Sequence, residues 1–376
     1  MLCLMREVLE YIENRIDIEH CRQAEKRHID AMDFKDIETL PLTIEYPANT
    51  QFHAHPYIEA YEDADKMFGR ELISISDNLV NSVSISDDFP LQIRANYGIG
   101  IIASLFGAEI LVQGETMPWV LHLDDEAFRK AISHGIPSVS GGIAQKVKEA
   151  YLRFNELLQD YSKCGEAIRI TQLDMQGPFD TLHLLRGQSV FYDMFDDPKM
   201  LHEALGVITE TMIEYKRSIM PLVNDSAGQG KFYIHGAIYG GSVLIKDDTA
   251  FAMISEAAYE EFCAPYNNRI FEVFGGKGSL HFCGSNKKWH SRQVGKQNIS
   301  CLNFGNPEMN DLFGEWGALS GKIQVVGYGD GQPYSFIKGY LEKGLRTGVT
   351  LKCKAGSEDE AKRILEEHYG FQNHKY

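Results

Sequence analysis

The second half of the chain alternates short β-like runs with helical stretches, and this pattern limits the possible folds more than any other feature of the sequence. The β-like runs cover residues 167–173, 231–236, 278–283, 299–304, 322–326 and 349–353. The helices expected between them cover about 197–220, 255–274, 310–319 and 335–345, and a last helix opens at Ser357. Strands that alternate with helices are typical of a parallel sheet. The number of units favours a closed (β/α)8 TIM barrel, since glycine-rich phosphate-binding signatures are missing.

The first third of the chain is expected to add to this barrel. Met5, Val8, Leu9 and Ile12 recur at helical spacing, which predicts a helical N-terminal extension over about residues 1–38. Early strands are expected at 40–45 and 109–113. The long insertion between them contains residues 74–88, which we interpret as a lid or cap. The whole chain, 1–376, is expected to be a single α/β barrel domain.

Composition excludes several classes of protein. Hydrophobic residues make up 44% of the 376 residues, which is enough for a large core, but no run reaches the roughly 20 apolar residues of a membrane helix. The N-terminus becomes charged at Arg6, so we expect no signal peptide and a cytoplasmic location. The net charge of −16 argues against a nucleic-acid partner. Seven cysteines without regular spacing predict reduced thiols.

Polar side chains gather where the expected strands end. In a (β/α)8 barrel the active site lies at the carboxyl ends of the strands. The residues at these positions are Asp174, Gln176, His235, His281, Cys283, Asn303, Tyr328, Asp330 and Cys353. This set is rich in metal ligands, whereas the strand interiors are apolar.

His281 and Cys283 are the strongest candidates for metal ligands. Residues two apart on a strand point to the same face, so these two side chains project together while Leu280 and Phe282 point away. Cys353 ends a later strand, and in a closed barrel the two strand ends can converge. Three protein ligands and one open position are typical of catalytic zinc. From spacing alone, buried structural roles for these residues remain an alternative.

The segment His281-Phe282-Cys283-Gly284, followed by Cys353, resembles the His-x-Cys…Cys zinc motif of methylcobamide:coenzyme M methyltransferases, which belong to the uroporphyrinogen decarboxylase superfamily. Residues 174–179 resemble the Gln-Gly-Pro strand end of that superfamily, and residues 245–266 resemble the segment before the zinc motif. The resemblance covers about residues 165–370 and does not extend to 1–160. It implies the (β/α)8 barrel fold.

The sequence differs from uroporphyrinogen decarboxylase itself in one loop, and this difference favours another branch of the superfamily. Uroporphyrinogen decarboxylase carries an arginine-rich loop near its N-terminus that grips substrate propionates. The corresponding residues here, 47–56, contain no arginine. The sequence is therefore more similar to the metal-dependent branch.

The resemblance implies a zinc-dependent methyltransferase. A methyl group would pass between a corrinoid (methylcobalamin), carried on a partner corrinoid protein, and a thiol or other small heteroatom substrate. His281, Cys283 and Cys353 would bind Zn²⁺, and the substrate heteroatom would take the open position. Glu115 and Asp174 are candidates for a fourth ligand.

Further residues are candidates for binding or catalysis. His235, Asp174, Tyr328 and Asp330 are candidate catalytic or pocket residues at strand ends. Asp247 and Asp248 could form an acid–base pair or hold the loop before a helix. His53 and His55 have metal-ligand spacing but lie in an expected loop.

Two other functions remain open at this stage. The chain could be a decarboxylase of the parent type, which needs no metal. It could also be a non-catalytic barrel that keeps a structural zinc.

Overall fold

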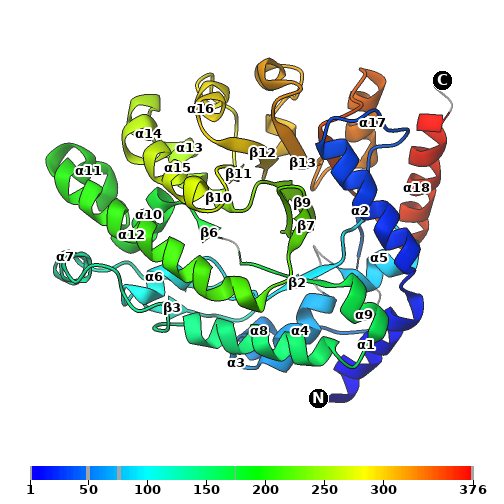
Figure 1. Ribbon diagram of the computed structural model, residues 1–376, viewed down its shortest axis with the longest axis horizontal. Coiled ribbons are helices and arrows are strands. Elements are labelled where there is room, and N and C mark those ends of the chain that lie inside the picture. Colours follow the sequence, from blue (N-terminus) through cyan, green and yellow to red (C-terminus); the bar gives the residue numbers. More distant parts are fainter. Residues whose placement is uncertain (1, 48–50, 74–77, 174, 374–376) are drawn as a thin grey trace.

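The protein is an α/β structure built on parallel strands. The computed structural model describes residues 2–47, 51–73, 78–173 and 175–373. Figure 1 shows strands arranged in an arc, with helices on its outer side and a small antiparallel sheet inside it.

Seven parallel strands form the main sheet, in the order β1-β14-β13-β12-β11-β10-β6. Their bounds are β1 (Leu42–Glu45), β6 (Met175–Gln176), β10 (Leu244–Lys246), β11 (Gly278–Phe282), β12 (Ile299–Phe304), β13 (Gln324–Tyr328) and β14 (Val349–Lys354). A second parallel pair joins β2 (Gln92–Arg94) to β5 (Arg169–Thr171), and β5 leads directly towards β6. Within the described ranges no backbone ladder joins β1 to β2, so the strands do not form a hydrogen-bonded closed ring.

Two carboxylates occupy the edge of β1 where a neighbouring strand would pair. The backbone N–H of Leu42 donates to Asp88 at 3.1 Å, and that of Ile44 donates to Asp87 at 2.8 Å. The backbone N–H of Asp88 donates a hydrogen bond to the carbonyl oxygen of Leu42. Arg27 and the hydroxyl of Tyr369 also donate to the fully buried Asp88 carboxylate. We call Asp87 and Asp88 the carboxylate seam. It satisfies backbone donors that the sheet leaves unpaired.

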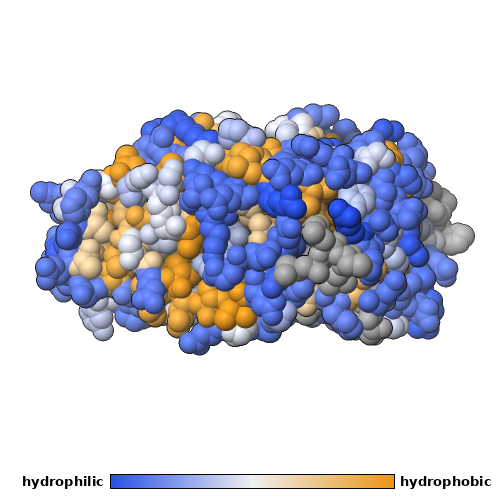
Figure 2. All heavy atoms as spheres, turned by 90° about the horizontal axis from the view of Figure 1, so that it is seen from below, coloured by the Kyte–Doolittle hydropathy of each residue, from blue (hydrophilic) through white to orange (hydrophobic). Residues whose placement is uncertain are grey.

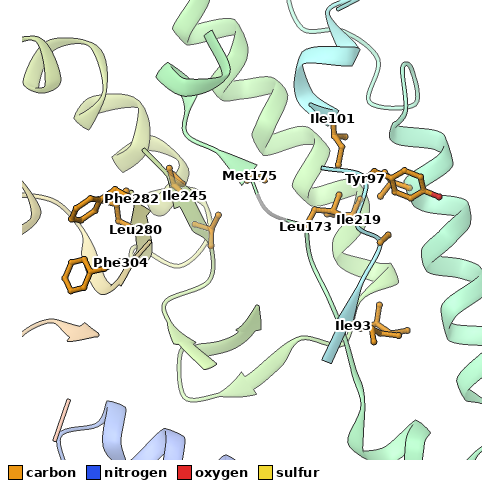
Figure 3. Packing of buried hydrophobic residues seen from close by; sticks show 14 of the residues in the cluster. Ile93, Tyr97, Ile101, Leu173, Met175, Ile219, Ile245, Leu280, Phe282 and Phe304 are labelled. Carbon is orange, nitrogen blue, oxygen red and sulfur yellow. The ribbon is translucent and has the colours of Figure 1, made fainter. Parts of the chain in front are cut away.

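Helices cover the outer face of the main sheet. The apolar side chains of Ile245, Leu280, Phe282 and Phe304 point to this face and belong to the main core (Figure 3). The helices from β6 onward are α10 (Pro178–Arg186), α11 (Ser189–Asp196), α12 (Pro198–Ile219), α13 (Asp248–Met253), α14 (Glu256–Phe262), α15 (Ala264–Val273), α16 (His290–Lys296), α17 (Tyr334–Glu342) and α18 (Glu358–Asn373).

The N-terminal part supplies further helices. The expected helical extension is present as α1 (Leu2–Arg15) and α2 (Ile18–Met32). The remaining helices are α3 (Tyr57–Glu62), α4 (Ala64–Leu72), α5 (Leu79–Ile85), α6 (Ile101–Leu105), α7 (Asp125–Ser133), α8 (Ala144–Leu158) and α9 (Ser162–Ala167).

An antiparallel three-stranded sheet lies on the inner face of the main sheet. It contains β7 (Ser226–Gly228), β8 (Lys231–Ile234) and β9 (Ala237–Gly240), which follow a short 3₁₀ turn, η1 (Met220–Leu222). Apolar side chains of β8 and β9 pack against Leu244, Cys301 and Val326 of the main sheet. The run 231–236 is therefore not a strand of the parallel sheet. The chain reverses at His235 and Gly236, whose φ angles of 51° and 75° suit a two-residue hairpin turn.

Several other expectations of the sequence are corrected. The strand expected at 109–113 is present as β3 (Ile110–Leu111), but it pairs antiparallel with β4 (Trp119–Val120) and is not part of the main sheet. The expected helix 310–319 is absent as an α-helix: residues Glu315–Leu319 form the 3₁₀ helix η3, and a second 3₁₀ helix, η2 (Pro307–Met309), lies before this range. In the expected lid, residues 74–77 lie outside the described residues. The rest forms α5 and the carboxylate seam, so these residues support β1.

The surface is mostly hydrophilic, with hydrophobic side chains gathered in part of the face seen in Figure 2. No helix in the described part of the chain has the length and apolar character needed to cross a membrane.

Substitution of Asp88 by alanine is expected to lower the free energy of unfolding by about 3 kcal/mol, because a buried ion pair loses one partner and the Leu42 N–H loses its acceptor. Urea denaturation of the purified variant measures this change. Glu203→Ala is the matched control, since Glu203 forms an exposed pair with Lys199, and it is expected to cost less than about 1 kcal/mol. Equal effects of the two substitutions would contradict a supporting role for the seam.

Candidate metal centre

A row of polar side chains lies on the inner face of the main sheet, near the carboxyl ends of four strands. Strand register places Lys246 of β10 beside Gln176 of β6 and beside His281 of β11. His281 is in turn beside Asn303 of β12. The residues before them, Ile245, Leu280 and Leu302, point to the outer core. Because successive side chains on a strand point to opposite faces, all the polar side chains of this row point to the inner face.

Three potential ligands meet at the end of this row. The ligand atoms of Asp248, His281 and Cys283 all lie within 4.8 Å of one another. Nε2 of His281 is 3.5 Å from Sγ of Cys283 and 3.6 Å from Oδ1 of Asp248. His281 and Cys283 thus converge as their spacing predicts. Asp248 begins α13, and its carboxylate also accepts the Cys283 N–H at 2.8 Å.

A hydrogen bond sets the orientation of the His281 ring. Nδ1 of His281 lies 2.5 Å from Oδ1 of Asn303. The Asn303 amide nitrogen donates to the carbonyl of Val326 at 2.9 Å, which fixes the amide so that its oxygen faces the histidine. Nδ1 therefore carries a proton, and Nε2, which has a lone pair when the ring is neutral, faces Cys283 and Asp248. A metal-ligating histidine uses such a bond to hold its ring and tautomer.

The electrostatics of the three ligands suit a cation. Burial, together with the Asp248 carboxylate, raises the pKa of the Cys283 thiol to about 12, and Lys246 acts in the opposite direction. Without a cation, the carboxylate and a thiolate would repel each other. A bound divalent metal reverses this effect and holds the thiol as thiolate. The residues present therefore fit a metal ion.

Two buried carboxylates hold Asp248 in place. Asp247 accepts hydrogen bonds from the Tyr259 hydroxyl at 2.8 Å and from the Asn267 amide at 2.7 Å. Asp180 accepts from the N–H groups that follow Asp248, those of Thr249 and Ala250. Of the two readings of the Asp247-Asp248 pair, holding the loop fits Asp247. Asp248 instead joins the metal cluster, which the sequence analysis did not foresee.

The structure does not bring Cys353 to the cluster, so its expected place among the ligands is corrected. Cys353 is paired in register with Ile44 of β1 and is fully buried in the outer core. Val349 and Leu351 share its face, as parity predicts, but that face is turned towards the helices. Lys352, the residue before it, points inward to Glu45 and Asp330.

The other candidate residues lie in different surroundings. Tyr328 is buried in the outer core, where its hydroxyl donates to the carbonyl of Asn310 at 3.0 Å, so it is not in the inner row. Asp330 pairs with Lys352 and lines a small inner cavity of about 70 Å³ that also touches Asn303 and His235. Asp174 lies outside the described residues.

The weaker candidate ligands are engaged elsewhere. Glu115 pairs with Arg70 at 3.1 Å and accepts the Tyr57 N–H. His55 lies 3.9 Å from Glu59. Neither Glu115, His53 nor His55 belongs to the cluster found among the described residues.

His235 reaches the polar row from the inner sheet. It lies at the tip of the β8–β9 hairpin, and its ring centroid is 6.1 Å from that of His281. Its Nδ1 is 2.8 Å from Nη1 of Arg94. Because a guanidinium can only donate, Nδ1 accepts, and the neutral ring carries its proton on Nε2. The turn thus places the His235 ring close to the candidate metal centre.

Comparison with known proteins shows a likeness of fold. No protein-family model matches the chain, and no curated protein matches its sequence. Among solved structures, the chain is similar to a methyltransferase from Methanosarcina mazei, with a TM-score of 0.66 and 17% identity. The likeness covers 93% of this chain and 98% of the other. At this identity it establishes a shared fold over nearly the whole length of both chains.

Replacement of Asn303 by alanine is expected to weaken metal binding by about 10- to 100-fold, because His281 loses the bond that fixes its ring. Titration with zinc against a competing chelator measures the affinity. Asn298→Ala, an exposed position just before the same strand, is the matched control and is expected to bind as the wild type does. Unchanged affinity in the Asn303 variant would contradict this role.

Proposed function

We propose that the protein is a zinc-dependent methyltransferase that moves a methyl group between a corrinoid and a small thiol or other heteroatom substrate. The observation that carries the proposal is the cluster of Asp248, His281 and Cys283, in which Asn303 already orients the imidazole. The cluster lies at the carboxyl ends of parallel strands, where enzymes of this architecture place their chemistry.

The donor set favours zinc. Zn²⁺ binds imidazole nitrogen, thiolate sulfur and carboxylate oxygen, and a catalytic site keeps one position open beside three protein ligands. When bound, the metal would lower the pKa of a substrate thiol, or act as a Lewis acid on another heteroatom. In this proposal Asp248 takes the place in the ligand set that the sequence resemblance gave to Cys353.

The surrounding residues would bind and orient the substrate. Asn303 holds His281, and Asp180 and Asp247 hold the first turn of α13, so the ligands need little rearrangement. His235 would form part of the wall beside a substrate placed at His281. Asp330 and Lys352 would contribute charge to the wall of the inner cavity.

The fold and the partner are part of the same proposal. We interpret the sheet as a (β/α)8 barrel of the uroporphyrinogen decarboxylase superfamily that is closed at β1 by the carboxylate seam. The zinc-motif resemblance and the likeness to the Methanosarcina mazei methyltransferase support this interpretation. The corrinoid would be carried by a separate protein.

Metal analysis tests the centre directly. Protein purified without chelator is expected to contain about one zinc per chain. His281→Ala and Asp248→Ala are expected to lose most of it, since each removes a ligand. Elemental analysis by mass spectrometry, with circular dichroism to check folding, gives the stoichiometry.

Cys353→Ser is the discriminating control for this experiment. It is expected to keep its zinc because Cys353 faces the outer core. Loss of zinc in Cys353→Ser, with zinc kept in Asp248→Ala, would contradict the proposed ligand set. Wild-type protein that binds no zinc would contradict the metal centre and favour a metal-free decarboxylase.

Methyl transfer is tested by following the methyl–cobalt absorption band. The zinc-loaded protein is expected to demethylate free methylcobalamin in the presence of a thiol such as coenzyme M, and the His281→Ala variant is expected to fall to the uncatalysed rate. A methoxylated aromatic and a methylamine, each offered with reduced cobalamin, test transfer in the opposite direction. Zinc-loaded protein that transfers no methyl group in any of these mixtures would contradict the methyltransferase and favour a structural zinc.

A further inference from the structure

A second cavity lies at the amino ends of the strands, whereas the candidate metal centre lies at their carboxyl ends. It has a volume of about 470 Å³ and is bounded by the end of α12, strands β7 and β8 of the inner sheet, and the end of α15. Gly241 and Ser242, which line it, lie shortly before β10, and Phe274 lies shortly before β11. The cavity therefore opens at the amino ends of strands whose carboxyl ends carry the metal cluster. Its volume falls in the range of small-molecule sites.

A buried lysine lies in the wall of this cavity. Lys216 of α12 is only 3% exposed, and its ammonium donates to the side-chain oxygen of Gln172. Gln172 in turn donates to the carboxylate of Asp225 at 2.8 Å. The Lys216 nitrogen also lies 5.1 Å from the centroid of the Phe274 ring. An ammonium has three N–H donors, and Gln172 is the one hydrogen-bond acceptor that the described residues give it.

The surroundings raise the fraction of Lys216 that is neutral above that of an exposed lysine. Burial lowers the pKa of Lys216 to about 8, and the attraction of Asp225 limits the shift. The cavity wall combines apolar side chains, among them Ile219, Val223 and Phe274, with polar ones such as Asp225, Gln229 and Lys231. A desolvated amine in an apolar pocket is the form of lysine that attacks carbonyl groups.

We propose that this cavity binds a small aldehyde or ketone with an apolar body, and that Lys216 forms a reversible imine with it. The neutral amine attacks the carbonyl carbon, so that a carbon–nitrogen bond forms. The carbinolamine then loses its oxygen as water, which takes both hydrogens of the amine. No oxidant or reductant is needed, and hydrolysis reverses the step.

A neutral carbonyl compound fits this cavity better than an anion. Asp225 is linked to Lys216 through Gln172, and its carboxylate, when ionised, would repel a second carboxylate. The apolar walls would leave a charged ligand poorly solvated. Aromatic or branched aldehydes match both constraints.

Reductive trapping tests the proposal. The full-length protein is incubated at pH 8 with limiting benzaldehyde and cyanoborohydride, and peptide mass spectrometry then counts the benzyl groups on each lysine. Lys199 is the internal control, because it lies on the same helix and is 89% exposed. Label on Lys216 is expected to exceed label on Lys199 by at least about tenfold, given the larger fraction of neutral amine.

Two variants separate the cavity from general reactivity. Lys216→Arg is expected to remove the label at residue 216 alone. Val223→Trp, which fills the cavity and keeps the amine, is expected to reduce label on Lys216 while Lys199 is unchanged. Label on Lys216 no greater than that on Lys199, or undiminished in Val223→Trp, would overturn the proposal. His281→Ala should label like the wild type, so the result is independent of the metal centre.

Discussion

The register of the parallel sheet is the constraint on which the candidate site depends. Because each strand is paired in a fixed register with its neighbours, Gln176, Lys246, His281 and Asn303 arrive at one level on one face. A shift of one residue in any strand would turn its polar side chain into the outer core. Asn303 can therefore hold His281 only while β11 and β12 keep their pairing.

The alternation of side chains between the two faces of a strand predicted part of this arrangement but not all of it. The alternation of strands and helices after residue 165 and the convergence of His281 with Cys283 followed from local pattern. Parity also grouped Val349, Leu351 and Cys353 correctly, but it cannot say which face of a strand is inner. That depends on pairing with β1, more than 300 residues away in the chain. The run 231–236 has strand composition, but the positive φ at His235 is invisible to a hydrophobic pattern.

The third member of the cluster shows a different limit of sequence reasoning. Asp247 and Asp248 are adjacent and chemically identical, and their roles separate only in three dimensions. Asp247 is buried and engaged with Tyr259 and Asn267, whereas Asp248 is at the start of α13 and faces the two other ligands. The sequence signal was present as a carboxylate pair before a helix. Which of the two carboxylates joins the cluster is seen only in the structure, where Asp180 accepts hydrogen bonds from the backbone of the same turn.

The carboxylate seam has a consequence for how this protein can evolve. Elsewhere in the sheet, backbone groups pair with backbone groups, and almost any side chain is compatible with that pairing. At the edge of β1 the acceptors belong to the side chains of Asp87 and Asp88. Amino-acid substitutions should therefore be tolerated less well at Asp87 and Asp88 than at most other positions of the sheet. Distant homologues that lack these two acids would need a different means of covering the same edge, such as a strand of their own.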